Sequence, residues 1–590
     1  AGAAGAAGDA AARGAADADA ATRDALLRCW VREREIAVPA TGPVTVPLAD
    51  GRGVTSTVRY RSATGLHEFG PVRAADDGAE LTAAELAALL VGDDPGTGAD
   101  DLVARVVDST ARIGRYLDVR RTEGVGARTA AGAGVGAGTD EFLGAEQDLL
   151  LGHLLHPAAK SRDGLSDTDD AAFAPELRGR FPLHWFAVHD SLVRSGSVVG
   201  GSAPGGPVPE HPSLAGRSVP ELLAGLSGVD SDRTLVPAHP WQARDLPGRP
   251  GFRALLDAGL VTPLGPAGPD WYPTSSLRTV YRPDQQVMLK LSLGLRITNS
   301  RRENTHTELV RGIEVHRLLE GGIADAVHAA YPGFRIVRDP GYLAVTDTDG
   351  GATHLDVSLR EVPAGLTGTR CLAGLVAPHP GIGPARLVGV VRRLARATGR
   401  PVSEVAREWV RRYVDHVLAP MVYLYASTGI GLEAHQQNTL VRLDADGWPA
   451  AGWYRDNQGY YLAESALPVV LSRTGEDRST LALAPDRIVD DRLTYYLLLN
   501  QALAPVATLG AAGVADEHDL LRSVRDGLAA LVQRGHDTTG GLAERWLTAE
   551  RLPCKANLAT RLAGIDEVLA PVDNQSVYVT VPNPLREAAR

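Results

Sequence analysis

The segment VMLKLSLGLRITNSRREN, residues 287–304, predicts a β-strand that carries unusual polar groups. Apolar side chains recur at every second position from Val287 to Leu293, which is the period of a strand with one buried face. Lys290 lies among the polar positions of this strand. The residues that follow include three arginines and three short polar side chains, namely Arg296, Thr298, Asn299, Ser300, Arg301 and Arg302.

Lysine is scarce in this chain, so its positions carry information. Only Lys160, Lys290 and Lys555 occur among 60 basic side chains, and arginine supplies the rest. An ammonium group is more compact than a guanidinium group, and its pKa shifts more readily. We therefore expect these lysines where arginine would not serve; the alternative is that they are chance survivors on the surface.

The composition is that of a globular protein with more than one lobe. The chain has 590 residues, 44% of them hydrophobic, and a mean hydropathy of -0.08, which is enough for several domains. A net charge of -11 and a pI of about 5.8 argue against a general nucleic-acid binder. Any anion site must therefore be built locally from clustered cations.

Cysteine usage and hydropathy predict a cytoplasmic protein. Cys29, Cys371 and Cys554 are odd in number and far apart, which indicates neither a disulfide framework nor a cysteine zinc site. No run of about 18 apolar residues is present, so no membrane span is expected. Residues 1–22, rich in Ala, Gly and Asp, lack the features of a signal peptide, and we expect them to form a disordered tail.

Local patterns predict the organisation of the rest of the chain. In the first 119 residues, periodicity predicts helices over 22–35, 82–91 and 100–117 and strands over 42–48 and 53–62. A Gly/Ala-rich segment at 124–141 predicts a flexible linker, because no apolar strand leads into it as a dinucleotide-binding loop requires. Residues 195–213 predict a surface loop. Residues 401–429 predict a long helix with Ser403 as its N-cap and Gly429 as its stop.

A polar loop directly after that helix predicts a metal site. Residues 433–438 read EAHQQN, a short strand is expected over 439–443, and Asp456 follows. In kinase-type sites an Asn and an Asp hold Mg²⁺ on a nucleotide, and carboxylates such as Glu433 and Asp456 are ligands that Mg²⁺ prefers. The alternative is a satisfied polar turn, although so many polar groups are costly to bury without a function.

Two further segments predict anion binding. PTSSLRTVY at 273–281 places hydroxyl groups and a guanidinium group on a turn that leads into the strand of Lys290, and this pattern is typical of a phosphate cradle. GHLLHPAAKSRDG at 152–164 has two histidines, a lysine and an arginine but no H-E-x-x-H zinc motif. A phosphate or carboxylate site is expected there, with a solvated basic turn as the alternative. His239 in LVPAHPWQARD is read either as a buried structural residue or as a catalytic one.

Taken in order, these segments resemble the IucA/IucC family of NRPS-independent siderophore synthetases over residues 150–585. The matching segments are GHxxHPxxKxRxG at 152–164, HPWQ at 239–242, SSLRT at 275–279, KLSLGLRITNSRR at 290–302, EAHQQN at 433–438, Asp456, LPCKANLATRL at 552–562 and NPL at 583–585. ITNSRR is similar to the citrate-using branch.

The resemblance implies a fold and a reaction. The expected fold is α+β, cupped like a hand, with a thumb at 23–140, fingers carrying the ATP phosphate motifs at 141–385, and a kinase-like palm with the metal and carboxylate site at 386–590. The expected reaction uses ATP and Mg²⁺ to adenylate a carboxylate of citrate, which an amine, amino acid or hydroxylamine then captures, with release of pyrophosphate and AMP. Members often pair as homodimers, and neither a nucleic acid nor a membrane is expected as a partner.

Matching by motif also implies roles for single residues. The triphosphate is expected to contact His156, Lys160, Ser276, Arg278, Thr279 and Lys290. Mg²⁺ is expected on Glu433 and Asp456. The polycarboxylate is expected to contact Thr298, Arg302, His435, Gln437 and Asn438, and the catalytic residues are expected to be His435, Lys290 and Arg302. Lys555, at an expected helix start after Pro553, is assigned to the second substrate. The choice between Arg301 and Arg302 stays open at this point.

Fixed cations are needed because citrate and the ATP–Mg²⁺ complex are both anionic and repel each other. Two other functions fit parts of the pattern. A small-molecule phosphotransferase would share the Asn/Asp site, but no H-x-D base precedes Asn438. A non-catalytic carboxylate- or siderophore-binding protein would need no ATP, but no Tyr/Cys/His cluster for iron is evident. The sequence does not name the amine, the citrate carboxyl that reacts, or the number of condensations.

Overall fold

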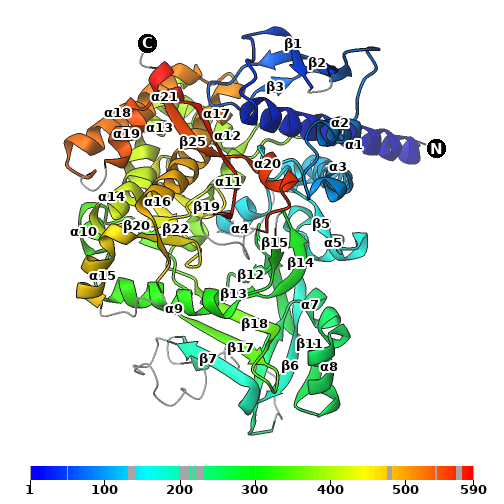
Figure 1. The fold of residues 1–590 in the computed structure, drawn as a ribbon, viewed down its shortest axis with the longest axis vertical. Coiled ribbons are helices and arrows are strands. Elements are labelled where there is room, and N and C mark those ends of the chain that lie inside the picture. The colour runs from blue at the N-terminus through cyan, green and yellow to red at the C-terminus, as the bar shows by residue number, and fades with distance from the viewer. Residues whose placement is uncertain are drawn as a thin grey trace.

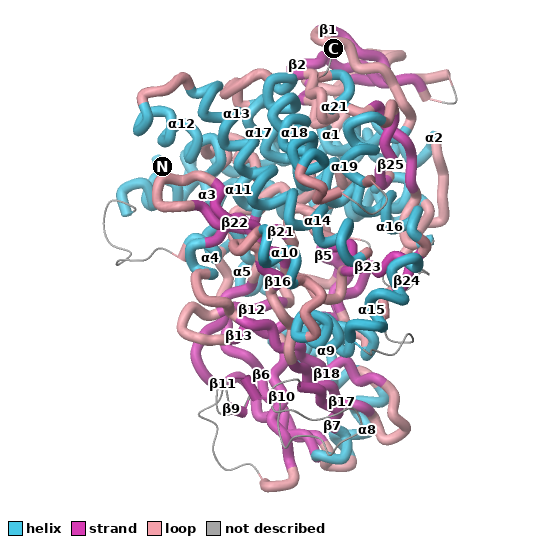
Figure 2. Tube along the Cα trace, turned by 90° about the vertical axis from the view of Figure 1, so that its left-hand side faces the viewer, coloured by secondary structure: helices cyan, strands magenta, loops and turns pink. Residues whose placement is uncertain are grey.

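The computed structural model describes residues 2–48, 51–130, 140–197, 213–214, 217–218, 230–298, 300–474, 481–537, 541–566 and 574–588. Helices gather in one half of the molecule and a large antiparallel sheet forms the other (Figures 1 and 2), so the α+β class is as predicted. No helix in these ranges is long and apolar enough to cross a membrane.

The N-terminal unit packs three helices beside a small sheet. Its helices are α1 (Gly2–Glu33), α2 (Ala83–Asp93) and α3 (Ala99–Ala130), and its strands are β1 (Gly42–Pro47), β2 (Gly53–Tyr60), β3 (Glu68–Phe69) and β4 (Arg73–Ala74). The strands and helices predicted in this part of the chain are confirmed.

The prediction of a disordered tail over residues 1–22 is wrong for the described residues 2–22, because α1 begins at Gly2. Alanine is the strongest helix former, and Ala18 is fully buried against Ile113 and Tyr116 of α3. Helix α3 also continues to Ala130, so the predicted linker is helical over 124–130. Its residues 131–139, and residues 198–212 of the predicted surface loop, lie outside the described ranges.

An eight-stranded antiparallel sheet forms the middle of the chain. Its strands, in spatial order, are β10 (Arg233–Ala238), β6 (Phe181–His189), β11 (Val261–Pro273), β12 (Thr279–Tyr281), β13 (Val287–Leu291), β18 (Ala352–Glu361), β17 (Gly341–Thr346) and β7 (Val193–Ser197). The predicted strand around Lys290 is β13, and Lys290 pairs with Thr279 on one side and Ser358 on the other. The turn between β11 and β12 is therefore held next to Lys290.

A second, three-stranded sheet joins two of the predicted motifs. It contains β15 (Ser300–Arg302), β14 (Leu293–Ile297) and β5 (Arg162–Asp163), in that order. Strand β5 belongs to the GHLLHPAAKSRDG segment, and β14 and β15 belong to the KLSLGLRITNSRR segment. Backbone pairing thus brings together two segments that are more than a hundred residues apart in the sequence.

The C-terminal half packs helices around two small sheets. One sheet has the order β16 (Arg335–Ile336), β22 (Pro449–Tyr454), β21 (Thr439–Leu443) and β19 (Thr369–Cys371), and the other has β20 (Ile430–Leu432), β23 (Tyr460–Ala463) and β24 (Leu483–Ala484). Strands β16 and β19 precede residue 386, so this sheet crosses the boundary expected between fingers and palm. Strand β21 is the strand predicted over 439–443.

The predicted helix over 401–429 is interrupted by one π-helical segment. It consists of α13 (Val402–Tyr413), η5 (Val414–Leu418) and α14 (Ala419–Thr428). Pro420 has no N–H to donate to the preceding turn, which accounts for the irregular hydrogen bonding there. Gly429 ends the helix at φ 71°, as predicted. The prediction of Ser403 as N-cap is wrong, because Pro401 holds that position without a side-chain hydrogen bond.

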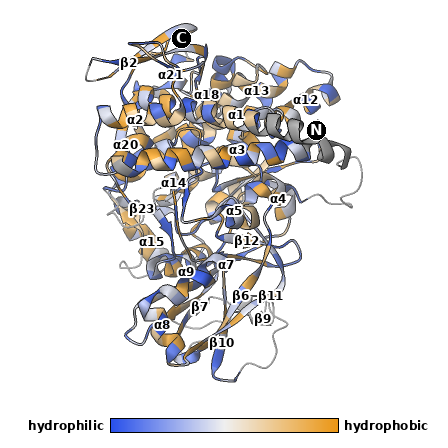
Figure 3. Ribbon diagram, turned by 90° about the vertical axis from the view of Figure 1, so that its right-hand side faces the viewer, coloured by the Kyte–Doolittle hydropathy of each residue, from blue (hydrophilic) through white to orange (hydrophobic). Residues whose placement is uncertain are grey.

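The end of the chain returns to the N-terminal unit. Strand β25 (Arg551–Lys555) pairs with β26 (Tyr578–Pro582), and helix α20 (Asn557–Leu562) lies beside α1, α2 and α3 (Figure 3). Leu558 and Leu562 of α20 belong to the same hydrophobic cluster as Leu26 of α1 and Leu102 of α3. The helix predicted after Pro553 begins at Asn557, and pairing with β26 keeps residues 551–555 extended, so Lys555 lies on a strand and not in the helix.

Candidate active site

A cavity of 340 Å³ lies where the large sheet, the second sheet and the helical half meet. Its walls include every residue that the sequence assigned to a site: His156, Lys160, Ser276, Arg278, Thr279, Lys290, Thr298, Arg302, Glu433, His435, Gln437, Asn438, Asp456 and Lys555. Residues from six separate segments thus converge on one space.

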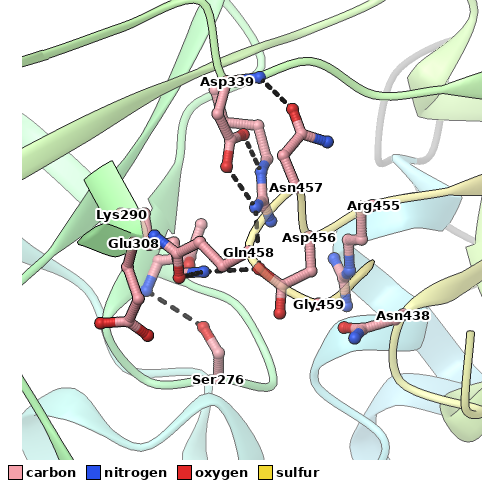
Figure 4. Close-up of polar contacts among 12 residues, drawn as sticks. Ser276, Lys290, Glu308, Asp339, Asn438, Arg455, Asp456, Asn457, Gln458 and Gly459 are labelled. Atoms are coloured by element: carbon pink, nitrogen blue, oxygen red, sulfur yellow. Dashed lines mark hydrogen bonds and ion pairs between the residues drawn. The ribbon is translucent and has the colours of Figure 1, made fainter. Parts of the chain in front are cut away.

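Lys290 and Asp456 form a partly buried ion pair in this cavity (Figure 4). The Lys290 side chain is about 5% exposed, and its Nζ donates to Asp456 Oδ1 at 2.6 Å and to Gln458 Oε1. Burial lowers the pKa of Lys290, an effect that Asp456 opposes. Burial raises the pKa of Asp456, but Lys290 and Arg360 outweigh this effect and hold the pKa below its usual value.

The backbone at Asp456 is in a strained conformation that its neighbours maintain. Its φ is 93°, a region that L-residues rarely occupy. The Tyr454 hydroxyl group donates to the carbonyl oxygen atoms of Asp456 and Gly459 at 2.8 and 2.6 Å. Arg360, which makes a bidentate ion pair with Asp339 at 2.7 and 2.9 Å, lies 3.6 Å from the Asp456 carboxylate. The Asp456 carboxylate is therefore fixed toward the cavity.

The turn between β11 and β12 presents hydroxyl groups and a guanidinium group beside Lys290. The backbone N–H of Thr279 donates to Ser276 Oγ at 3.1 Å, which fixes the turn. Arg278 donates to the carbonyl oxygen of Arg302 at 2.8 Å and to Asn304 Oδ1 at 2.9 Å. Both acceptors are neutral, so these hydrogen bonds orient the guanidinium group without neutralising it.

Arg301 and Arg302 line different cavities. Successive residues of a strand point to opposite faces. Arg302 lines the 340 Å³ cavity, where it donates to Thr298 Oγ1 at 2.9 Å. Arg301 is exposed and lines a different cavity of 590 Å³ together with Arg296. The predicted pairing of Thr298 with Arg302 at one site is therefore geometrically consistent.

The EAHQQN loop supplies an imidazole group and oxygen ligands. Burial lowers the pKa of His435, so the imidazole is neutral near pH 7. Glu433 Oε2 accepts a hydrogen bond from the Tyr461 hydroxyl group at 2.9 Å, and Gln437 donates to Ser275 Oγ at 3.1 Å. Among the residues that the structure describes, no three His, Cys, Asp or Glu side chains cluster as a metal site. A metal here would need further oxygen ligands from substrate and water.

The GHLLHPAAKSRDG turn differs from its prediction in one respect. The Lys160 Nζ donates to Glu176, and Arg162 donates to both oxygen atoms of the same carboxylate at 2.8 Å. All three side chains are buried, so the alternative of a solvated basic turn is wrong. Lys160 lines the cavity, but its charge is paired inside the protein. His239 is fully buried and accepts a hydrogen bond from the Trp241 N–H as an N-cap, which matches the structural reading.

Several lining residues escaped sequence reasoning. Three of them, Tyr495, Tyr496 and Asn500, come from the π-helical segment η7 (Thr494–Ala502). The Asn500 side-chain Oδ1 accepts a hydrogen bond from the Gln436 N–H at 2.9 Å, and its Nδ2 lies 2.8 Å from His153 Nε2. No repeat of apolar side chains in the sequence predicts a π-helix, although π-helical segments often lie at functional sites.

A buried carboxylate ties three of the cavity walls together. Glu146, in α4 (Glu141–Glu146), pairs with Arg455 at 2.7 Å and accepts hydrogen bonds from the N–H and hydroxyl group of Ser275 at 2.9 and 2.7 Å. Arg455 also donates to the carbonyl oxygen of Gln437 at 2.8 Å. In the sequence, the only sign that these residues belong to the site was the position of Arg455 next to Asp456.

The charge of the cavity favours anionic ligands. Eight Lys and Arg side chains line it, against two carboxylates, Glu433 and Asp456. Carboxylates behind the lining, Glu176, Asp339 and Glu146, pair with four of these cations, so the excess of positive charge rests on Arg278, Lys290, Arg302 and Lys555. A low-dielectric space with this excess of fixed cations attracts polyanions such as phosphates and polycarboxylates.

Comparisons with known proteins agree with this geometry. The IucA/IucC family model matches residues 141–377, and a model described as ferric iron reductase FhuF-like transporter matches residues 407–569. The rhizobactin siderophore biosynthesis protein RhbC of Rhizobium meliloti is 36% identical over 549 residues, which is 90% of each chain. The spermidine-citrate ligase of Bacillus anthracis is 34% identical and covers 84% of this chain and 80% of its own.

Solved structures extend the likeness to the whole fold. The ATP-bound aerobactin synthetase IucA of Klebsiella pneumoniae has a TM-score of 0.80 and 28% identity, covering 96% of this chain and 99% of its own. The α+β synthetase fold expected from the sequence is thus confirmed. Ordered motifs, a shared cavity and a relative matched along 90% of both chains agree, and the chain belongs to the IucA/IucC family of NRPS-independent siderophore synthetases.

Proposed function

We propose that the protein uses ATP to join a carboxyl group of citrate to an amine in siderophore biosynthesis, with release of AMP and pyrophosphate. The observation that carries this proposal is the convergence of Lys290, Arg278 and Arg302 on one cavity. Two polyanions meet at low cost only where fixed cations offset their repulsion. The relatives named above include a citrate ligase, in agreement with this chemistry.

The first half-reaction forms an acyl-adenylate. A citrate carboxylate oxygen attacks the α-phosphorus of ATP, the bond from that phosphorus to the bridging oxygen breaks, and pyrophosphate leaves. Lys290 and Arg278, with the hydroxyl groups of the 275–279 turn, are assigned to the phosphates. Arg302 and Thr298 are assigned to citrate, because a guanidinium group and a hydroxyl group in contact match a carboxylate.

The second half-reaction forms the amide. The amine nitrogen attacks the acyl carbon, the carbon–oxygen bond to AMP breaks, and the nitrogen loses a proton. His435 is suited to accept that proton because burial keeps its imidazole neutral. Gln437 and Asn438, from the same loop, are assigned to the carboxylates of citrate that do not react.

Mg²⁺ is part of the proposal. The carboxylates of Glu433 and Asp456 and the amide oxygen of Asn438 line the same cavity, and they are hard oxygen donors of the kind that Mg²⁺ takes together with phosphate and water. When bound, the ion neutralises charge on the phosphates. Lys290 and Arg360 both contact Oδ1 of Asp456, and Oδ2 is the oxygen that would hold the ion.

The test is pyrophosphate release with citrate, succinate and 2-oxoglutarate, each combined with a panel of diamines and amino acids. The proposal expects release that depends on citrate, and AMP as the nucleotide product. Formation of ADP would identify the protein as a phosphotransferase and overturn the proposal. The proposal includes a homodimer, to be checked by sedimentation, and a cytoplasmic location, because ATP is the energy source.

A further inference from the structure

Four side chains at the wall of the candidate active site form a closed ring of hydrogen bonds. The Ser275 hydroxyl group donates to Glu146 Oε2 at 2.7 Å, and Arg455 Nη2 donates to the same oxygen at 3.1 Å. Arg455 Nη2 also donates to the carbonyl oxygen of Gln437 at 2.8 Å, and the Gln437 side-chain amide donates to Ser275 Oγ at 3.1 Å. The ring thus runs from Ser275 through Glu146, Arg455 and Gln437 back to Ser275.

The ring joins two segments that face the cavity from different sheets. Ser275 belongs to the turn between β11 and β12 of the eight-stranded sheet, and Gln437 belongs to the loop between β20 and β21 in the helical half. In the proposed function the turn holds the phosphates of ATP and the loop holds citrate. Because the single O–H of Ser275 donates to the ring, the hydroxyl groups of Ser276 and Thr279 are the ones left for the phosphates. The separation of the two reactants therefore depends on how the turn is fixed against the loop.

Glu146 is the member of the ring that lies behind the cavity lining. Its side chain is fully buried, and Oε1 pairs with Arg455 Nη1 at 2.7 Å. The backbone N–H of Ser275 donates to Oε2 at 2.9 Å. Burial lowers the pKa of Arg455, but the Glu146 carboxylate outweighs burial and raises it, so Arg455 stays charged. One carboxylate thus holds the turn directly and the loop through Arg455.

The backbone that carries Glu146 has little freedom to move. Glu146 is the last residue of α4, which packs against α11 (Leu372–Val376). Gly374 of α11 lies so close to α4 that a Cβ atom at this position would overlap the carbonyl group of Ala145. A buried ion pair adds little net stability over apolar residues of the same volume. The contribution of Glu146 is therefore one of geometry.

We propose that Glu146 is a positioning residue for adenylate formation, which sets the turn that holds ATP against the loop that holds citrate. This inference rests on the proposed function. In the first half-reaction the α-phosphorus and the attacking carboxylate oxygen belong to separate molecules on different walls, so their separation depends on the ring. A misplacement of about 1 Å can slow such a step about a hundredfold. In the second half-reaction the citryl and AMP groups are one molecule, and attack by the amine depends far less on the ring.

The first experiment opens the ring at Glu146. Glu146→Gln keeps the length of the side chain but replaces one oxygen with an NH₂ group, which faces donors of Arg455 or of Ser275 in either orientation. Glu517→Gln is the matched control. Glu517 is also buried, accepts hydrogen bonds from the hydroxyl group of Ser62 at 2.9 Å and from the next backbone N–H at 2.6 Å, and lies away from the lining of the cavity.

Rate constants from single turnovers separate positioning from a loss of folded protein, because unfolded protein lowers the amplitude of a turnover and not its rate constant. Citrate-dependent pyrophosphate release without an amine gives the rate constant of the first half-reaction. Hydroxamate formation, after hydroxylamine is added to adenylate preformed in the presence of pyrophosphatase, gives the rate constant of the second half-reaction.

We expect Glu146→Gln to lower the first rate constant about 10–100-fold and to change the second by no more than about threefold. The control should match wild type in both. An unchanged first rate constant in Glu146→Gln, or an equal fall in both rate constants, overturns the inference. If the wild-type protein releases no pyrophosphate with citrate, the proposed function fails instead.

A second experiment leaves the buried ion pair intact, so it decides the question even if Glu146→Gln does not fold. Ser275→Ala removes the hydroxyl group that joins Glu146 to Gln437. We expect a lower first rate constant at a nearly constant Kd for ATP, whereas Ser62→Ala, which removes the same contact from Glu517, should change neither. In the double variant of Glu146 and Ser275 the loss should fall well short of the product of the two single losses, because members of one network do not act additively. Losses that multiply, or weaker ATP binding at an unchanged rate constant, overturn the role of the ring.

Discussion

Replacing Lys290 tests the centre of the site most directly. Lys290→Arg keeps the positive charge and the contact with Asp456 but replaces a compact ammonium group with a planar fork. We expect normal folding and a fall in kcat of about 10²–10³, the usual effect of losing one preorganised donor at developing charge. Pyrophosphate release at saturating citrate and ATP measures this loss.

The stability of a second variant, Lys290→Met, gives an independent magnitude. Removing one partner of a buried ion pair costs about 3–5 kcal/mol. Arg360, at 3.6 Å from the Asp456 carboxylate, remains in place, and the Asp456 side chain is 28% exposed, so we expect a loss at or below the lower end, about 3 kcal/mol. Lys290→Arg should lose much less free energy of unfolding. Comparing the two variants by urea unfolding at pH 7 separates the effect of the charge from the effect of the donor geometry.

The pH dependence follows from the depressed pKa of Asp456. A carboxyl group whose folded-state pKa is lowered contributes stability that is present above its unfolded value, about pH 4, and is lost as the pH falls through the folded value. The gap between wild type and Lys290→Met should therefore be widest at neutral pH and narrow below about pH 4. A gap that is constant with pH, or wild-type activity in Lys290→Arg, would refute the assigned role of the ion pair.

Three further predictions concern the other groups of the cavity. Asp456→Asn and Glu433→Gln should each raise the Mg²⁺ concentration needed for half-maximal pyrophosphate release, and a response identical to wild type in both would place the metal elsewhere. Arg302→Ala should weaken citrate binding by about 2–4 kcal/mol, which raises the KM for citrate and leaves the KM for ATP nearly constant. Arg301→Ala, on the opposite face, should change neither KM. A larger effect of Arg302→Ala on the KM for ATP than on the KM for citrate would reverse the assignment. Lys555→Ala should leave hydroxylamine trapping of the adenylate nearly intact and slow capture by the amine; equal loss in both assays would indicate a structural role.

The sequence alone predicted the elements whose causes are local. The alternation around Lys290 predicted β13, the glycine at 429 predicted the end of a helix, and the order of polar motifs predicted which side chains share a cavity. These signals depend on the period of side chains along one strand or helix and on the conformational freedom of glycine. They need no knowledge of what packs against them.

Only the tertiary structure decided the pairings between distant segments. The alanine-rich start of the chain is helical partly because α3 buries Ala18. Lys555 is extended because β26 pairs with its strand. The register of β14 and β15 sends Arg302 rather than Arg301 into the cavity. A buried carboxylate, Glu176, takes the charge of Lys160. In each case the partner is remote in sequence, and a side chain's role depends on the charge and space that this partner supplies.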